Sequence, residues 1–243
     1  MFFSVHKLRK HGVLAVLLLL LCPVFSFAQK RISADVEVKT LMGKNVVTNL
    51  RSLYCSSNGR MVITSRNPVE YVMITNLNKE TTIYFPGTNE VVVDKSSMSG
   101  AGDELLSLFL FGRLEDLGVG LSGYRLVSTE MQEDGLVKKD FTSSDKNMPP
   151  YCEIVYRDYL PIYSATLDAD RNYLTKVYYS QYNEVGWMPF PHRNTRITYT
   201  SKKDSTIVRT IYSNIVIDGD DPMFEFTVPA DAKPMDLNNK KIK

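Results

Sequence analysis

Few residues of this sequence have the types and spacing that catalysis requires. Beyond the first 28 residues the only histidine is His192, in the run Phe-Pro-His-Arg. A Ser-His-acid triad would have to use this one side chain, and no Gly-x-Ser-x-Gly elbow accompanies it. A lone histidine in a turn is more typical of a structural or solvent-facing position. We therefore predict no catalytic residues and a protein that is not an enzyme.

Two acidic clusters invite comparison with calcium sites. Asp168 and Asp170 form the first, and residues 218–221, Asp-Gly-Asp-Asp, form the second. Neither has EF-hand spacing, and turns commonly use Asp without a metal. Histidine and cysteine are not clustered as a zinc site requires. The sequence predicts neither a metal nor a cofactor.

A glycine-rich run from Gly118 to Gly123, Gly-Val-Gly-Leu-Ser-Gly, formally matches the dinucleotide-binding fingerprint. That fingerprint needs a strand before it and a helix after it. Here a predicted helix precedes the run and a predicted strand follows it. The match therefore carries no prediction of nucleotide binding.

Residues 1–28 have the pattern of a secretory signal peptide. Three basic residues near the start precede an apolar run, Val13 to Leu21, that is too short to span a bilayer well. Ser26 and Ala28 are small residues at the positions that a signal peptidase reads. We expect cleavage after Ala28 and a soluble periplasmic protein. The alternative is an uncleaved N-terminal anchor.

The charge of the remaining chain limits its partners. Three of the 29 Lys and Arg residues lie in the leader, which leaves 26 basic against 27 acidic residues. A near-neutral chain without a basic stripe argues against nucleic acid and against electrostatic binding to anionic membranes. We expect a monomer with no nucleic-acid partner.

Two cysteines follow the leader, Cys55 and Cys152. An exported chain can oxidise such a pair to a disulfide. Two separate, buried thiols that behave as small apolar residues explain the same pattern. The sequence leaves both interpretations open.

The chain from residue 29 to 232 is typical of one mainly β domain, followed by a polar tail at 233–243. Short apolar runs alternate with turns about every ten residues, which favours an antiparallel barrel or sandwich. The predicted strands are Asp35–Thr40, Val46–Leu53, Arg60–Ser65, Tyr71–Thr75, Thr81–Phe85, Glu90–Val93, Tyr124–Met131, Cys152–Tyr159, Ile162–Leu167, Leu174–Tyr182, Thr195–Thr200, Thr206–Ile217 and Phe224–Val228.

One segment, Asp103 to Phe111, predicts a helix instead of a strand. Asp103 is a candidate N-cap, and Gly112 suits the position just after the helix. The segment is apolar on nearly every side, whereas a surface helix would have a polar face. Protein or an apolar ligand must therefore cover it.

Alternate positions of the predicted strands supply an apolar stripe. A packed core and a sheet lined for an apolar ligand, with the helix as plug or lid, both fit this pattern. The candidate lining residues are Met61, Ile63, Val72, Ile74, Ile83, Phe85, Leu105, Leu106, Phe109, Leu110, Ile154, Tyr156, Phe224 and Phe226.

An ordered series of segments resembles a known family. The series comprises residues 59–63 (GRMVI), 67–74 (NPVEYVMI), 83–91 (IYFPGTNEV), the apolar helix with 123–126 (GYRL) after it, and 224–229 (FEFTVP). In order and spacing it is similar to the outer-membrane lipoprotein carrier (LolA-like) proteins. The resemblance covers most of Asp35 to Lys233.

This resemblance implies a fold: a strongly curved antiparallel sheet that forms an unclosed barrel, with short helices as plug or lid over an apolar cavity. The family usually opens with an amphipathic helix, but Gln29 to Ala34 leaves no room for one here. The family's Arg-Pro pair at the cavity is interrupted, since Asn67 stands between Arg66 and Pro68. Arg66 is carried over only as a candidate charge at the cavity mouth.

The resemblance also implies a function. A periplasmic carrier would bind the acyl chains of lipoproteins, or a related lipid, and would exchange them between an inner-membrane donor and an outer-membrane acceptor. An alternative is a lipid- or lipoprotein-sensing module of the same fold with a membrane partner. Two further hypotheses are a hydrolase and a purely structural β protein with a dry core.

Overall fold

The computed structural model describes residues 30–76, 80–94, 104–186, 188–201 and 204–235, and its strands form a single sheet. The expected leader and the candidate N-cap Asp103 lie outside these ranges. The strands are β1 (Arg31–Met42), β2 (Asn45–Ser56), β3 (Met61–Asn67), β4 (Tyr71–Thr75), β5 (Thr81–Phe85), β6 (Glu90–Asp94), β7 (Arg125–Met131), β8 (Val137–Thr142), β9 (Tyr151–Arg157), β10 (Leu160–Leu167), β11 (Tyr173–Val185), β12 (Met188–Ser201), β13 (Asp204–Ile217) and β14 (Lys233–Pro234).

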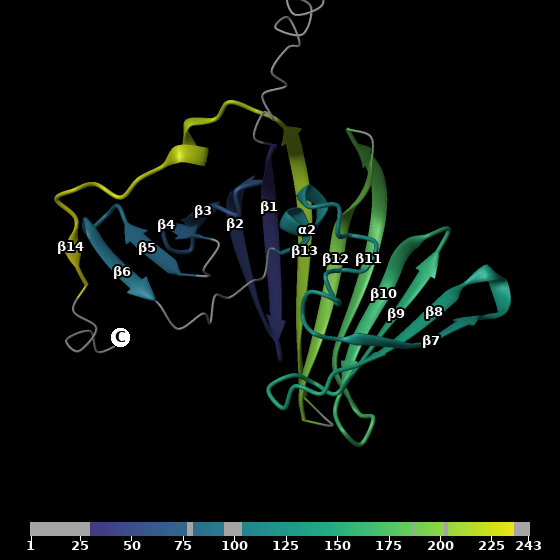
Figure 1. The fold of residues 1–243 in the computed structure, drawn as a ribbon. Helices are drawn as coiled ribbons and strands as arrows, with labels where there is room; N and C mark the ends of the chain where they lie inside the picture. Colours follow the sequence, from purple (N-terminus) through teal and green to yellow (C-terminus); the bar gives the residue numbers. More distant parts are fainter. Residues whose placement is uncertain (1–29, 77–79, 95–103, 187, 202–203, 236–243) are drawn as a thin grey trace, which may run out of the picture.

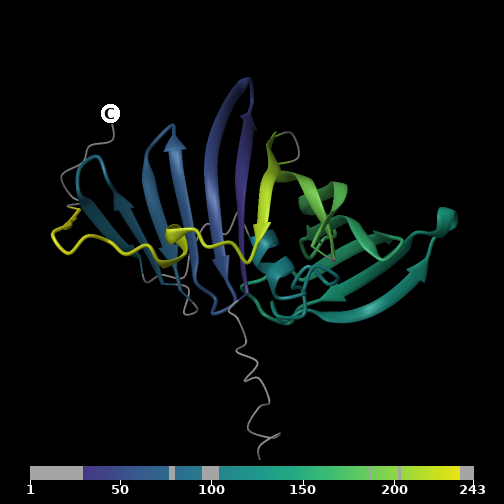
Figure 2. The ribbon, with the colours of Figure 1, turned by 90° about the horizontal axis from the view of Figure 1, so that it is seen from above.

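The sheet is curved and does not close. Its strand order is β14-β6-β5-β4-β3-β2-β1-β13-β12-β11-β10-β9-β8-β7, so β14 and β7 are its edges. Every pairing is antiparallel except the short one between β14 and β6. Figures 1 and 2 show two wings bending away from β1 and β13, with the edges far apart. The predicted fold class, an unclosed antiparallel barrel with few helices, is confirmed.

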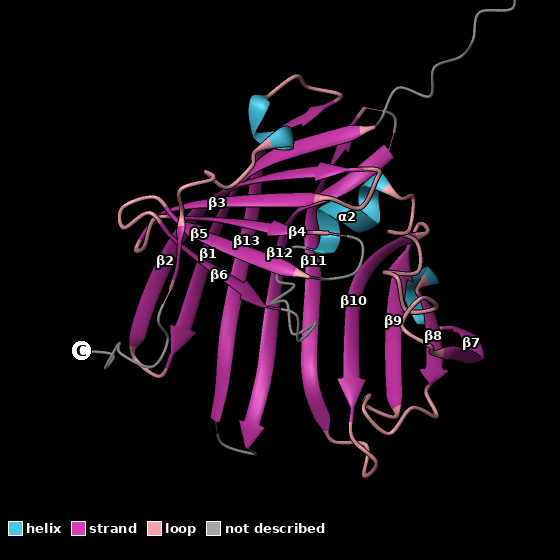
Figure 3. Cartoon of the chain, turned by 60° about the vertical axis from the view of Figure 1, so that its left-hand side comes forward, coloured by secondary structure: helices cyan, strands magenta, loops and turns pink. Residues whose placement is uncertain are grey.

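One face of the sheet, here called the inner face, packs against the helix α2 (Glu104–Leu110), which lies inside the curve (Figure 3). Strict alternation on β1 directs Ile32, Ala34 and Val36 to this face, and all three are buried. Each strand residue points to the opposite side from its neighbour. The centre of the inner face is therefore apolar, since every second residue of this part of β1 is apolar.

The opposite face, here called the outer face, is covered over β2 to β6 by the C-terminal segment. After β13 comes a 3₁₀ helix, η2 (Pro222–Glu225), and the chain then crosses to β14 beside β6 (Figure 1). The ring of Phe224 meets Tyr54 edge-on at 5.4 Å between centroids, and Phe226 lies 6.1 Å from Tyr84. Arg60 donates to the backbone carbonyls of both phenylalanines.

This segment corrects the predicted closing strand Phe224–Val228. Asp221 accepts a hydrogen bond from the backbone N–H of Met223 at 2.8 Å, which starts the 3₁₀ turn. Pro222 and Pro229 flank the segment, and proline cannot donate to a β ladder. The alternating aromatic side chains serve to anchor the segment on the outer face and do not place it in the sheet.

Two other differences from the expected elements concern strand content. The predicted strands between residues 35 and 217 are all present, but β8 was not predicted. Its sequence, Val-Lys-Lys-Asp-Phe-Thr, is mostly polar and lacks an apolar run, and Lys138 forms ion pairs on the outer face with Asp140 and Glu153. The first two residues of the expected tail form β14.

No described helix has the length and apolar character needed to cross a membrane.

Candidate functional site

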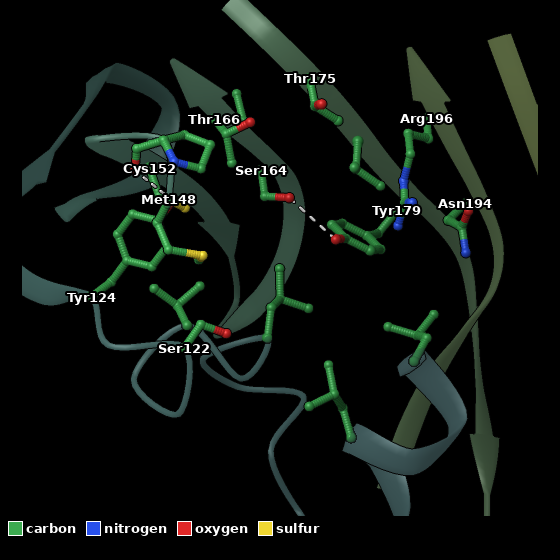
Figure 4. Close-up of a pocket in the computed structure, with 17 residues that line it drawn as sticks. Ser122, Tyr124, Met148, Cys152, Ser164, Thr166, Thr175, Tyr179, Asn194 and Arg196 are labelled. Atoms are coloured by element: carbon green, nitrogen blue, oxygen red, sulfur yellow. Dashed lines mark hydrogen bonds between the residues drawn. The ribbon is translucent and has the colours of Figure 1, made fainter. Parts of the chain in front are cut away.

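A cavity of about 300 Å³ lies between α2, the loop that follows it, and the inner face of β9 to β12 (Figure 4). Its apolar walls come from all three parts. The helix contributes Leu105 and Leu108, the loop contributes Leu117, Val119 and Tyr124, and the sheet contributes Val177 and Cys152; Met148 closes the side near β9.

The helix α2 separates this cavity from the central core. Leu106 and Phe109 are almost fully buried on the core side, where Phe109 meets Phe190 edge-on at 5.2 Å. Leu108 and Leu105 face the cavity. An all-apolar helix thus has one side in protein and one side against a cavity, which explains why the sequence shows no polar face.

The loop from residue 112 to 124 is held against α2 by close packing. Gly118 has φ +70°, and a Cβ at this position would lie 2.7 Å from Cδ2 of Leu108. Asp116 accepts hydrogen bonds from Arg113 at 2.7 Å and from the Gly118 backbone N–H at 3.0 Å. Burial alone would raise the pKa of the Asp116 carboxyl, but these donors lower it overall. The glycine-rich run is therefore a wall of the cavity.

The floor of the cavity mixes polar and apolar groups. The hydroxyls of Ser164 on β10 and Tyr179 on β11 lie 3.2 Å apart and form a hydrogen bond. Burial raises the pKa of Tyr179, while this bond and the charge of Arg196 on β12 oppose the rise. Burial also raises the pKa of the Cys152 thiol, to about 12. Both groups are therefore neutral at physiological pH.

The structure brings several predicted lining residues to the inner face, but only Leu105 lines this cavity. Met61 and Ile63 on β3, and Leu110, belong to the core beside α2, together with Leu106 and Phe109. Ile154 and Tyr156 on β9 pack beneath the loop against Val119 and Tyr124. Ile83 and Phe85 are half-buried on β5, and strand register aligns Ile83 with Met73 on the face of Ile63.

Four predicted lining residues lie on the outer face, which corrects their assignment to one inner stripe. Ile63 pairs with Met73, so Val72 and Ile74 point away from α2. Phe224 and Phe226 lie on the outer face with the C-terminal segment. Periodicity alone could not distinguish the faces, because both sides of β3 and β4 are covered and both are apolar.

Arg66 also lies away from the cavity. It lies at an irregularity in the pairing of β2 with β3 and lines an outer-face groove with Asp35, Ser52 and Thr64. The interrupted Arg-Pro pair therefore gives no charge at the cavity mouth. Sequence reasoning missed the arginine that does line the cavity, Arg196, because its strand Thr195–Thr200 reads as an ordinary alternating strand.

The other candidate reactive side chains, His192 and Asp168, each make a structural contact. Nδ1 of His192 lies 3.2 Å from the backbone oxygen of Tyr212, and its ring packs beside Phe190. Asp168 accepts from the backbone N–H groups of Asp170 and Asn172 and so closes the β10–β11 turn. In the described part of the chain no group of three or more His, Cys, Asp or Glu is arranged to hold a metal.

Cys55 and Cys152 are both buried, and they form no disulfide with each other. Cys55 lies in the core under α2, where Ser107 donates to its sulfur at 3.7 Å, whereas Cys152 lines the cavity. The structure thus settles the open question in favour of two separate thiols.

No family model matches the sequence, and no curated protein matches it significantly. Solved structures do match. A DUF1329 family protein from Desulfovibrio piger is 15% identical, with TM-score 0.58 over 89% of this chain and 96% of that one. A putative outer membrane lipoprotein-sorting protein domain from Vibrio parahaemolyticus is 14% identical, with TM-score 0.55 over 77% and 85%. A LolA superfamily protein from Nitrosomonas europaea is 10% identical, with TM-score 0.52 over 79% and 86%.

Proposed function

We propose that this protein is a non-enzymatic carrier that binds the acyl chains of lipoproteins, or of a related lipid, in the cavity under α2. The chain has the LolA-like fold, as the likeness to the three solved structures shows. The observation that carries the proposal is the cavity itself, with apolar side chains from helix, loop and sheet around it. The name of the Vibrio parahaemolyticus neighbour, a putative lipoprotein-sorting domain, points to the same class of cargo.

The size of the cavity favours reversible binding. About 300 Å³ is at the lower end of ligand pockets. At roughly 30 Å³ for a water-sized group, it has room for about ten methylene groups of one chain. Each buried methylene contributes ~0.8 kcal/mol, so the gross gain is ~8 kcal/mol. The costs of association reduce this gross gain, so net binding is weak enough to permit the release that a carrier needs.

The proposed carrier acts in the periplasm, after export. The leader-like residues 1–28 support a periplasmic location, and β1 begins at Arg31, so cleavage after Ala28 leaves the whole sheet intact. In that compartment the carrier would take cargo from an inner-membrane donor and pass it to an outer-membrane acceptor. No covalent step is required of the protein.

Native mass spectrometry of protein exported and purified without detergent tests this function. We expect added mass that matches a lipid or an acylated polypeptide, and uptake of a synthetic acylated peptide by protein without cargo. Leu108→Asp should lower this uptake at least tenfold, because a carboxylate against the cavity must be desolvated when the chain enters. The same spectrum gives the mass of the mature chain and thus checks cleavage after Ala28.

Phe111→Asp is the matched control, because Phe111 follows α2 directly but is 47% exposed and does not line the cavity. We expect it to bind like the wild type. Equal loss of uptake in both variants would mean that the end of α2 was disturbed as a whole. Wild-type protein that carries nothing and takes up no acylated peptide would refute the carrier.

A further inference from the structure

Polar side chains gather at one side of the cavity, on β11 and β12. Figure 4 shows Arg196 and Asn194 on β12 near Tyr179, across the space from Tyr124 and Met148. The carrier proposal needs only the apolar walls and leaves this side of the cavity unexplained.

In the described chain, the sheet neighbours of Arg196 carry no charge. In the sheet its neighbours are Val177 on β11 and Val208 on β13. The described lining of the cavity contains no Asp or Glu, and within the described chain Arg196 makes no ion pair. A carboxylate on a neighbouring strand of a sheet would stabilise such a cation. An arginine between two valines, beside an apolar cavity, lacks such a partner.

Hydrogen-bonding capacity accompanies this charge. The Asn194 amide, with no partner in the described chain, lies two residues before Arg196 on the same strand. Asn194 pairs with Tyr179, whose hydroxyl contacts Ser164 at 3.2 Å. Guanidinium and amide groups together suit the oxygens of a carboxylate or a phosphate.

We propose that the cavity binds amphiphiles with an anionic head group, and that Arg196 holds that head group while the acyl chain lies against Leu108 and Val119. This inference rests on the proposed acyl-binding function and adds the sign of the head group. The Arg196 side chain is itself exposed, so the head group stays at the solvent side while the chain is buried. A neutral or cationic head group would forfeit the charge-assisted hydrogen bonds at this position.

Isothermal titration calorimetry at pH 8 tests the inference, with each probe kept below its micellar concentration or its solubility limit. Laurate and dodecyl phosphate supply the two anionic head groups on one chain length, and dodecanol supplies a neutral one. We expect the wild type to bind both anionic probes about tenfold more tightly than dodecanol, and Arg196→Gln to remove this preference while it still binds dodecanol. Arg196→Lys should keep part of the preference.

Arg209→Gln is the matched control. Arg209 is exposed on β13 next to Val208, and its position opposite Thr195 places it on the outer face. Arg209→Gln removes one positive charge, as Arg196→Gln does, but on the face away from the cavity. This variant should therefore retain the full preference for anionic probes. Circular dichroism and thermal melting of each variant check that the sheet is intact.

The outcomes separate the two proposals. Equal affinity of wild-type protein for laurate and dodecanol would overturn the anionic head-group site and leave the acyl carrier standing. An absence of binding to all three probes would overturn both. Competition by inorganic phosphate at concentrations similar to dodecyl phosphate would show a site for free anions and would also overturn the inference, because the chain would then contribute nothing.

Discussion

At the scale of single residues, two buried tyrosines differ in one hydrogen bond: Tyr124 in the loop after α2 and Tyr156 on β9. Tyr124 donates its hydroxyl to the backbone oxygen of Pro149 at 2.8 Å. The Tyr156 hydroxyl is fully buried and has no hydrogen-bond partner in the described chain. Both rings lie in the same apolar cluster, so the pair isolates the contribution of the hydroxyl.

We predict that Tyr156→Phe raises the free energy of unfolding by about 1 kcal/mol, because it removes an unsatisfied buried polar group. Tyr124→Phe should lower it by about 1 kcal/mol, since the carbonyl of Pro149 loses its donor. Urea unfolding at pH 7, followed by circular dichroism, measures both. A loss in Tyr156→Phe as large as that in Tyr124→Phe would show that the Tyr156 hydroxyl has a partner in the native protein.

At the scale of elements, the C-terminal segment anchors the outer face through Phe224. This side chain is 1% exposed, and Arg31 lies over its ring at 5.3 Å from the centroid. We predict that Phe224→Ala lowers the free energy of unfolding by about 3 kcal/mol or more, as expected for a fully buried phenylalanine. Phe226→Ala, at a half-buried position of the same segment, should cost about half as much.

Uptake of acylated peptide by the folded fraction of both variants should equal that of the wild type, because neither side chain lies on the face of the cavity. Chemical denaturation measures the free energy of unfolding, and native mass spectrometry measures the uptake of acylated peptide. If Phe224→Ala kept its stability and lost uptake, the original assignment of Phe224 to the ligand would be restored.

These elements also show how far the sequence could lead. The alternation of apolar and polar residues predicted the strands, because every second residue of a strand faces the same side of the sheet. The segment that is apolar on nearly every side predicted α2. The same alternation failed to assign Val72 and Ile74, because register sets the face and register depends on pairing with β3. It failed for Phe224 because an extended segment packed on a sheet has the side-chain pattern of a strand within one.

The cavity was harder to predict than the fold for a related reason. Its walls come from α2, from a glycine-rich loop and from four strands, and only the curvature of the sheet brings these parts together. Leu108 and Val119 have no distinguishing sequence pattern, and Arg196 resembles any exposed strand arginine. The resemblance to the lipoprotein carriers implied an apolar cavity under a helix, whereas tertiary packing decided which side chains face it.

At the scale of the whole molecule, burial of ionisable groups predicts a loss of stability at alkaline pH. The pKa of the Cys152 thiol and that of Tyr124 are both raised to about 12, chiefly by burial, and burial also raises the pKa of Tyr182. Ordinary values are 9.0 for the thiol and 10.0 for tyrosine. Between pH 9 and 12 the unfolded chain therefore releases protons that the folded chain retains, so stability is complete below about pH 9 and falls as pH rises.

We expect the free energy of unfolding to fall by roughly 3 kcal/mol or more between pH 8 and pH 11. Urea unfolding at pH intervals across this range measures the slope. Cys152→Ala and Tyr124→Phe should each make the slope shallower, since each removes one group that ionises only on unfolding, whereas the outer-face variant Arg209→Gln should leave the slope unchanged. A wild-type profile that stays flat to pH 11, or a Cys152→Ala profile with the wild-type slope, would mean that these groups are open to solvent in the native protein and that the inner face is wetter than its packing indicates.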